Sequence, residues 1–446
     1  MYEELTLGVL CTYLAGLLLF GLWMSRKVHD PDAFFLANRK LGTWPLTATI
    51  TATVVGGSAT IATGALIYQQ GLPGLWLDIG GALGLIILGL TIARSVRKTG
   101  LVTLPEIIEY LFDTRVRYAA ALLIVFIQIA WVSLLLQGAQ AVLAVLLPFD
   151  PVLLLVLIAL VFVIYTIVGG QIAVVATDII QFLVMIIGLC AIAVPLLLLE
   201  VWSEIPTISA DLLSFPVNAS LGILPVLSFF FMMLMPHIVG PDIYSKILSA
   251  KDEKTARKAA IFSGFWKFMF AGSVGIMAIA AIILFPGLEN PSLALPTVMT
   301  TLHPALAGIL LAAFLSVMLS SADSVLLSGS TIISVDLTRR RTIQDSRLAI
   351  IFIAAAALIL ALYLQDIINT LKLAYTVFTA GLTLPVIFGF YKEKTKVTSK
   401  GAFFSLLFGG GSSLVWLGLN SPYIDAVLIG MIVSLIPLLL FRKKIK

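Results

Sequence analysis

Long apolar segments divide this chain along most of its length, and this pattern limits the folds that it can adopt. Hydrophobic residues make up 60% of the chain and charged residues 11%, whereas soluble proteins carry about 25% charged residues. The sequence therefore predicts an all-α polytopic membrane protein. We count thirteen segments that are long enough, or nearly so, to cross a bilayer: 5–25, 44–70, 73–94, 118–147, 151–169, 173–199, 222–246, 260–286, 303–335, 347–365, 368–391, 400–418 and 423–441.

Basic residues test this count, because cytoplasmic connections are enriched in lysine and arginine. With the N-terminus outside, 26 of the 28 basic residues, Arg117 and Lys246 among them, fall in cytoplasmic connections or in the C-terminal tail. The other two, Lys267 and Lys372, lie within apolar segments, and the outer connections carry acids. We expect thirteen spans, with the N-terminus outside and the C-terminus cytoplasmic. The net charge of +5 thus reflects topology, and it predicts no nucleic-acid partner.

Polar residues cluster inside the ninth apolar segment, in a run of serines from Ser316 to Ser330 that also contains Asp323. An ionisable residue within a membrane span marks a functional site by default. Hydroxyl and carboxylate oxygens are also the ligands that hard cations prefer. The run therefore predicts a cation site.

Two other spans contain residues that interrupt helices. The second span has Gly56 and Gly57 at its middle, which favours either close helix packing or a broken helix whose freed carbonyls bind ions. The seventh span contains Pro236, Gly240 and Pro241. Because the two interrupted spans lie five segments apart, we expect two five-helix units of inverted topology, 44–199 and 222–391, with binding at the midplane between them.

Other classes of function find little support in the sequence. The three histidines, His29, His237 and His303, are scattered, and there is no H-E-x-x-H motif of a zinc enzyme. No G-x-x-x-x-G-K-[ST] loop is present to bind the phosphates of a nucleotide, which argues against a primary pump. Cys11 and Cys190 both lie in apolar segments and predict no disulfide framework. We expect no enzyme, whereas a channel or a sensor stays open as an alternative.

Four segments together resemble the sodium:solute symporters, which include sodium-coupled proline, pantothenate, sialic acid, sugar and iodide carriers. The segments are Asp32–Gly42, Val168–Gln181, Pro241–Lys251 with Thr255–Arg257, and Ser320–Ser324. The resemblance covers nearly the whole chain and implies a leucine-transporter-like fold in the cell membrane. It also implies one extra helix before the core, 5–25, and two after it, 400–441.

The resemblance further implies the ligands of a main sodium site. These are the backbone carbonyls of Val54, Gly57 and Val317 and the hydroxyls of Ser320 and Ser321. Residues three to four apart share a helix face, so the ninth-span ligands are compatible with one site. A second cation site, or an ion exit path, would use Asp178, Ser320, Asp323 and Ser324. Gly56 stands where the proline carriers have an acid, which argues against their particular mechanism.

The solute pocket is expected beside the main sodium site. Its predicted residues are Ser58, Thr60, Thr63, Gln128, Phe230, Phe231, Met233, Lys267, Tyr375, Phe378 and Thr379. For Lys267, an alternative is that its amine extends to the cytoplasmic interface. The fourth span has no arginine to pair with a carboxylate, which disfavours acidic sugars.

The function that these resemblances imply is Na⁺-coupled symport by a monomer. The solute would be a small polar organic molecule such as an amino acid, carboxylate, vitamin or sugar. Coupling to H⁺ instead of Na⁺ is the alternative, and the solute itself stays open.

Overall fold

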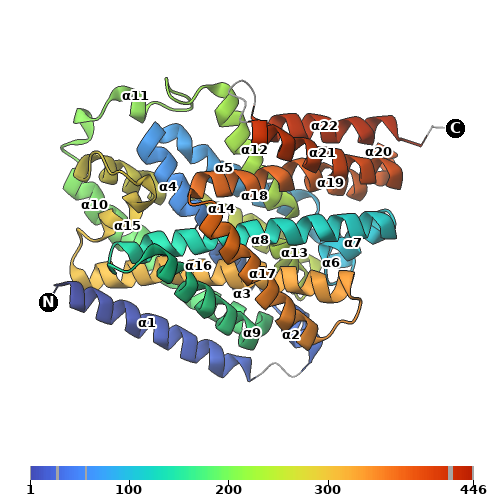
Figure 1. Cartoon of the computed structure of the whole chain (residues 1–446), viewed down its shortest axis with the longest axis horizontal. Helices are drawn as coiled ribbons and strands as arrows, with labels where there is room; N and C mark the ends of the chain where they lie inside the picture. Colours follow the sequence, from blue (N-terminus) through green and yellow to red (C-terminus); the bar gives the residue numbers. More distant parts are fainter. Residues whose placement is uncertain (1, 27–29, 56–57, 420–424, 444–446) are drawn as a thin grey trace.

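The computed structural model describes residues 2–26, 30–55, 58–419 and 425–443, and within these ranges the chain is helical and forms no strand. Figure 1 shows the arrangement of the helices. Their bounds are α1 Tyr2–Ser25, α2 Pro31–Leu36, α3 Thr43–Val55, α4 Ser58–Gln70, α5 Trp76–Thr91, α6 Ala93–Lys98, α7 Leu104–Leu111, α8 Thr114–Ala144, α9 Pro151–Val184, α10 Val194–Val201, α11 Ala210–Leu213, α12 Ile223–Val239, α13 Pro241–Leu248, α14 Glu253–Leu284, α15 Ala294–Met299, α16 Pro304–Ile332, α17 Ile343–Tyr363, α18 Ile367–Phe378, α19 Leu384–Phe390, α20 Lys392–Thr395, α21 Ser399–Leu419 and α22 Ala426–Leu440.

Many of these helices, alone or joined to the next one, form spans long and apolar enough to cross a membrane. In the described residues ten spans meet this criterion, and α3 with α4 forms one more if the bent pair is a single span. Two shorter apolar helices are Pro151–Ile167, the first part of α9, and Ala426–Leu440. The all-helical, multi-span class is therefore confirmed. The count of thirteen and the orientation of the termini stay predictions.

Aspartates and prolines begin several of the long helices. Asp113 accepts hydrogen bonds from the amides of Arg115 and Val116 at the start of α8. Asp150 caps α9 in the same way, and Pro151 occupies the first helical position. A carboxylate there satisfies amides that have no partner within the helix, and proline needs no such partner. These residues set where the long spans begin.

Both predicted interruptions fall between two helices of one span. The axes of α3 and α4 differ by 46°, and Gly56 and Gly57 between them lie outside the described residues. Helix α12 ends at Val239, and Pro241 occupies the first position of α13. Gly240 between them is not helical, with φ −53° and ψ 133°. Each break leaves helix ends inside the bundle, where the terminal carbonyls and amides need partners from outside their own helix.

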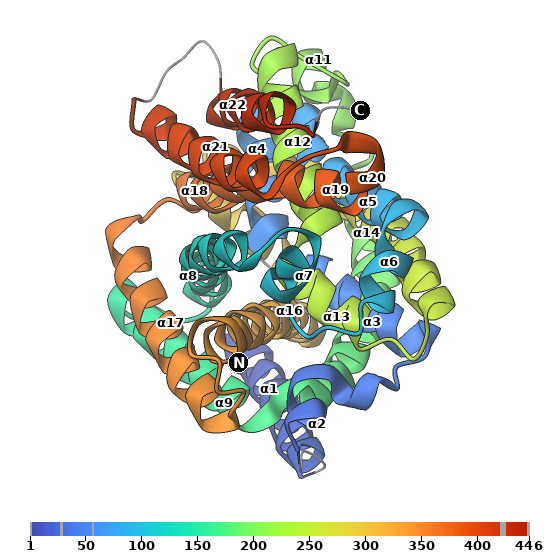
Figure 2. The ribbon, with the colours of Figure 1, turned by 90° about the vertical axis from the view of Figure 1, so that its right-hand side faces the viewer.

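Helix α16, the serine-rich span, lies at the centre of the bundle. It packs against α1, α3, α8, α9, α13 and α17, and Figure 2 shows it surrounded by these neighbours. Of its apolar stretch 83% is buried, compared with 22% for α1. The polar side chains of α16 therefore face protein rather than lipid.

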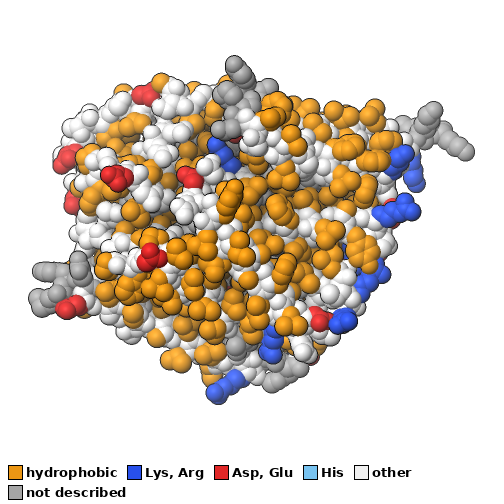
Figure 3. Space-filling model, viewed as in Figure 1, with side chains coloured by type: hydrophobic (Ala, Val, Ile, Leu, Met, Phe, Trp, Pro, Cys, Tyr) orange, Lys and Arg blue, Asp and Glu red, His pale blue; other side chains and the backbone are white. Residues whose placement is uncertain are grey.

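Charged side chains separate toward opposite ends of the molecule. Figure 3 shows lysines and arginines along the right-hand edge, where Figure 1 places α6, α7 and α20, and acids mainly at the left. This agrees with the expected basic and acidic sides.

Two of the basic residues expected in cytoplasmic connections are buried. Lys246 is 0% exposed in α13. Arg117 in α8 is 8% exposed, and its Nε lies 2.8 Å from Asp336 Oδ1. Its guanidinium also contacts Glu109. A hydrogen bond from Thr114, and after it the contact with Arg117, hold the pKa of the Glu109 carboxyl below its ordinary value. Segment boundaries read from hydropathy cannot reveal that a helix folds back into the bundle.

Candidate functional site

The site begins at the broken end of α3, where the last carbonyls have no partner within their own helix. Side chains from other elements bond three of them. Ser321 Oγ of α16 donates to Thr53 O at 2.9 Å, and Lys267 Nζ of α14 donates to Val54 O at 2.8 Å. Thr60 Oγ1 of α4 donates to Val55 O at 2.6 Å. The break thus presents a cluster of backbone oxygens to α16 and α14.

Serines on α16 complete this cluster from the opposite side. Ser321 Oγ also lies 3.0 Å from Val317 O, one turn earlier in its own helix. Ser324 Oγ lies 3.2 Å from Thr53 Oγ1. Of the predicted main sodium ligands, Val317 and Ser321 therefore lie at the interface between α3 and α16, whereas the Val54 carbonyl accepts its hydrogen bond from Lys267 of α14. Gly57 lies outside the described residues.

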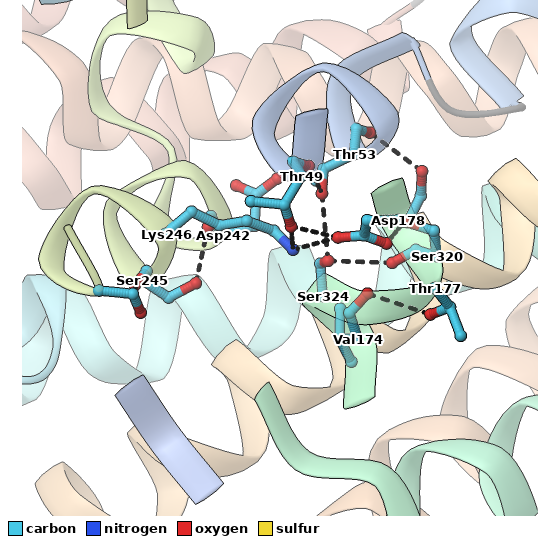
Figure 4. Close-up of polar contacts among 12 residues, drawn as sticks. Thr49, Thr53, Val174, Thr177, Asp178, Asp242, Ser245, Lys246, Ser320 and Ser324 are labelled. Carbon is cyan, nitrogen blue, oxygen red and sulfur yellow. Dashed lines mark hydrogen bonds and ion pairs between the residues drawn. The ribbon is translucent and has the colours of Figure 1, made fainter. Parts of the chain in front are cut away.

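Ser320 belongs to a neighbouring cluster around Asp178 of α9, which Figure 4 shows. The carboxylate of Asp178 accepts hydrogen bonds from the hydroxyls of Ser320 and Thr49. Lys246 Nζ of α13 lies 2.9 Å from Asp178 Oδ2 and 2.7 Å from Thr49 Oγ1. Asp178 and Lys246 are both 0% exposed. Four helices therefore converge on one buried ion pair.

Asp323 faces away from this pair. Its Oδ1 accepts a hydrogen bond from Thr166 of α9, and its Oδ2 is buried without a partner in the described part of the chain. The residues predicted for a second cation site thus divide. Ser320, Ser324 and Asp178 lie together beside Lys246, whereas the carboxylate of Asp323 contacts Thr166.

A second buried ion pair lies on the other side of the α3 break. Lys267 Nζ is 2.8 Å from Asp78 Oδ1 of α5, and the two residues are 1% and 3% exposed. The lysine passes α5 at Gly81, where a Cβ atom would lie 2.5 Å from Lys267 Cε. The second oxygen of Asp78 is buried and has no partner among the described residues. Lys267 thus turns inward and does not extend to the interface.

A small cavity of about 40 Å³ adjoins the broken ends of both interrupted spans. Its residues come from α3, α4, α8, α12, α13, α16 and α18. They are Thr53, Val54, Ala59, Trp131, Leu134, Leu135, Pro236, His237, Asp242, Ile243, Ser321, Val325 and Tyr375. The cavity therefore combines oxygens of the α3–α16 interface with aromatic rings and one aspartate.

Comparison with known proteins identifies the family. The model of the sodium:solute symporter family matches residues 34–409, most of the chain. The chain belongs to this family. It is therefore a multi-span membrane transporter rather than an enzyme, and sodium is the coupling ion of its family.

Relatives with established names support this membership. The chain is 25% identical over 470 residues to the osmoregulated proline transporter OpuE of Bacillus subtilis, covering 97% of this chain and 92% of the relative. A sodium/proline symporter of Staphylococcus aureus is 23% identical, covering 93% and 86%. A high-affinity choline transporter of Caenorhabditis elegans is 30% identical over 187 residues, which span 39% of this chain and 32% of that relative.

Solved structures establish the fold. A Na⁺-coupled sialic acid symporter in a substrate-bound, outward-open state superposes with a TM-score of 0.80 at 20% identity, covering 99% of each chain. Mhp1, a nucleobase-cation-symport transporter, superposes in its closed conformation with a TM-score of 0.60 at 16% identity, covering 92% of this chain and 94% of Mhp1. The symporter therefore has the expected leucine-transporter-like fold.

The predicted pocket residues have varied positions in this symporter. Tyr375 lines the cavity, and Phe378 packs on Trp131 with ring centroids 5.2 Å apart. Thr379 Oγ1 donates to Met232 O at 3.2 Å, and Gln128 Nε2 donates to Ser328 Oγ at 2.7 Å. Met233 of α12 and Thr63 of α4 are buried. Phe230 of α12 packs against Trp76. Phe231 is half-buried, and the side chain of Ser58 lies outside the described residues.

Sequence reasoning missed Asp78, Trp131, His237, Lys246 and Asp242 as members of this region. Asp78 and Asp242 are ionisable residues near or within apolar segments, so the default rule for such residues applied to both. Trp131 gives no such signal, because aromatic residues are common throughout the spans. Its place in the cavity wall depends on the packing of α8 against α18.

Proposed function

We propose that this protein is a secondary active symporter that couples inward Na⁺ flow to uptake of a small polar organic solute. The observation that carries the proposal is the contact of Ser321 of α16 with the Thr53 carbonyl of α3, beside a cavity. Membership of the sodium:solute symporter family supports the choice of ion. The proline and choline transporters among its relatives support a small solute.

The main sodium ion would be held by Val54, Gly57, Val317, Ser320 and Ser321. Carbonyl and hydroxyl oxygens are hard ligands that suit Na⁺, and ligands without formal charge favour a weak site that releases its ion. Val54 O accepts a hydrogen bond from Lys267, so sodium and this amine compete for one oxygen. The free oxygen of Asp78 gives the amine an alternative partner when sodium arrives.

The path of sodium toward the cytoplasm would pass Asp178. Ser320 and Ser324 connect the α3–α16 interface to this carboxylate. Asp178 already holds the ammonium of Lys246, so a passing sodium ion has to exchange with it. We therefore propose Asp178, Ser320 and Ser324 as an exit path. Asp323 lies beyond it as a separate carboxylate for a cation or a proton.

Alternating access would follow from motion of one bundle about this midplane site. The two breaks, in spans five segments apart, support inverted units at 44–199 and 222–391. The basic edge of the molecule supports a cytoplasmic C-terminus and an external N-terminus. With α22 and the first part of α9 counted as spans, the total is the thirteen of the sequence analysis.

Uptake into proteoliposomes tests the proposal. The reconstituted protein is offered radiolabelled amino acids, short carboxylates, vitamins and sugars under an inward Na⁺ gradient, with K⁺ of equal concentration as control. At least one solute should accumulate only with Na⁺. Accumulation driven equally by a proton gradient without Na⁺ would favour H⁺ coupling, and equilibration without accumulation would indicate a channel.

Ser321→Ala sharpens the same assay. This variant removes a hydroxyl at the α3–α16 interface, and we expect the Na⁺ concentration for half-maximal uptake to rise about tenfold or more, a change of ~1.4 kcal/mol. Ser330→Ala is the matched control, because its hydroxyl bonds Leu327 O of its own helix. An unchanged Na⁺ requirement in Ser321→Ala would contradict the assigned site.

A further inference from the structure

The cavity contains a carboxylate that forms no ion pair in the described part of the chain. Asp242, in the first turn of α13, lines the cavity. Lys246, one turn further along the same helix, bonds Asp178, as Figure 4 shows. The buried lysine nearby, Lys267, bonds Asp78. Asp242 thus lines the cavity without an ion-pair partner among the described residues, because both nearby lysines are paired with other acids.

Such a charge is costly inside a membrane protein unless a cation meets it. The amino end of α13 offsets part of the cost, because acids are favoured in a first helical turn. A cationic ligand at the cavity would supply the missing opposite charge.

Aromatic rings line the same cavity. Trp131 and Tyr375 both contribute to its wall, and their ring centroids lie 5.2 Å apart. Faces of tryptophan and tyrosine attract a positively charged nitrogen, and such rings form the cages that recognise quaternary ammonium groups. A carboxylate with two adjacent rings therefore has the chemistry of an ammonium site.

Trp131 provides a second, independent sign of a ligand. Its indole Nε1–H is buried and has no hydrogen-bond partner among the described residues, although the side chain is 95% enclosed. A buried donor without an acceptor is disfavoured, and tryptophan N–H groups usually find a partner. An oxygen of the solute would satisfy this donor.

We propose that the transported solute carries a positively charged nitrogen, held between the Asp242 carboxylate and the rings of Trp131 and Tyr375. This inference rests on the proposed symport function and narrows its solute class. The nitrogen lies on the α13 side of the cavity, away from the sodium ligands. A neutral or anionic oxygen-bearing end faces Thr53, Val54 and Ser321, because a second cation there would repel sodium.

The size of the cavity limits the solute. A volume of about 40 Å³ holds only a few water molecules, since one water needs roughly 10–15 Å³ by this measure. A bound solute must therefore be small and must displace side chains of the wall. Compounds with a single ammonium centre and one oxygen-bearing group meet this limit better than sugars.

Matched pairs of compounds test the charge directly. Thermal unfolding of the purified protein is followed in Na⁺ with choline, glycine betaine, proline and primary amino acids. Their uncharged-carbon counterparts are 3,3-dimethylbutanol for choline, 3,3-dimethylbutanoate for betaine and cyclopentanecarboxylate for proline. We expect at least one ammonium compound to raise the Tm, while its carbon counterpart at equal concentration does not.

Variants connect that shift to the cavity. Asp242→Asn should lower the affinity for the solute by more than about tenfold, while the Tm increase caused by Na⁺ alone persists. Asp32→Asn, at an exposed aspartate of α2, should change neither shift. If Asp242→Asn does not fold, Trp131→Leu carries the test and should cause a loss of similar size.

Several outcomes would overturn the inference. These are equal stabilisation by the carbon counterparts, stabilisation by neutral sugars but by no ammonium compound, the absence of any ammonium compound that raises the Tm, and full solute binding in both variants. If Na⁺ alone does not raise the Tm of the wild-type protein, that result counts instead against the proposed function. Failure of the inference and failure of the proposed function are therefore distinguishable.

Discussion

Two buried ion pairs join helices in the interior of the symporter. The pairs Lys246–Asp178 and Lys267–Asp78 join α13 to α9 and α14 to α5. Their side chains are at most 4% exposed, and each charge loses the solvation that water would give. Removing one partner of a buried pair is therefore more harmful than removing both. The two pairs fix four helices around the broken end of α3.

Replacement of Lys246 tests this view. Lys246→Met leaves Asp178 as a buried, uncompensated carboxylate, and we expect a loss of about 3–5 kcal/mol in stability. Unfolding in detergent by heat or denaturant provides the measurement. Lys251→Met is the control, because Lys251 is exposed and should tolerate the change. The double variant with Asp178→Asn should regain part of the loss, and a double variant less stable than Lys246→Met would refute the pairing.

Residue positions could be predicted from the sequence only where a chemical pattern marks them. Ser321 was found because serines are unusual within an apolar span, and it does meet a carbonyl of α3. The partner of Asp178 was not found, because Lys246 is 68 residues away along the chain. Which buried charges pair depends on how helices pack, and periodicity carries no information on that.

At the scale of elements, close helix packing and helix breaks have different sequence origins. Gly80 and Gly84 of α5 face α12, where added Cβ atoms would lie 2.5 Å from Phe230 O and 2.4 Å from Leu234 O. Small residues let two backbones approach in this way in membrane proteins. This contact positions α12, and with it the break at Gly240, against the rest of the site.

Gly84→Ala should force α5 and α12 apart. Overpacking of this kind costs about 1–3 kcal/mol, and we expect a lower Tm together with weaker Na⁺ stabilisation. Gly272→Ala offers a matched control in another span, α14, because nothing lies within 4 Å of its added Cβ. Equal Tm values for the two variants would show that the close contact is unimportant.

Helix breaks were easier to predict than helix contacts. Proline and glycine interrupt helices by their own backbone properties, so the break at Gly240 follows from the local sequence. The approach of α5 to α12 involves glycines that look like ordinary small residues in a span. The local sequence therefore predicts the break at Gly240, whereas the packing of α5 against α12 is seen only in the folded bundle.

For the molecule as a whole, hydropathy and charge predicted the class well. A bilayer requires long apolar helices, and cytoplasmic connections are enriched in basic residues, so both features can be recognised in the sequence. Arg117 and Lys246 are exceptions, because they pair with Asp336 and Asp178 inside the bundle. The orientation itself is still a prediction.

Cysteine labelling measures that orientation. In a variant without Cys11 and Cys190, Ala219→Cys should react with a membrane-impermeant maleimide from outside the cell. Lys254→Cys, in the first turn of α14, should react only after the membrane is permeabilised. Both positions are exposed in the structure. The reverse pattern would mean that the symporter is inserted the other way.

Sodium binding at the α3–α16 interface is the central claim, and binding of radioactive sodium to the purified protein measures it most directly. The wild-type protein should bind sodium saturably, in competition with unlabelled Na⁺ but not with K⁺. Ser321→Ala should lose about tenfold or more of its affinity, while Ser330→Ala should bind like the wild type. Saturable sodium binding that is unchanged in Ser321→Ala, or no saturable binding in the wild-type protein, would contradict the account.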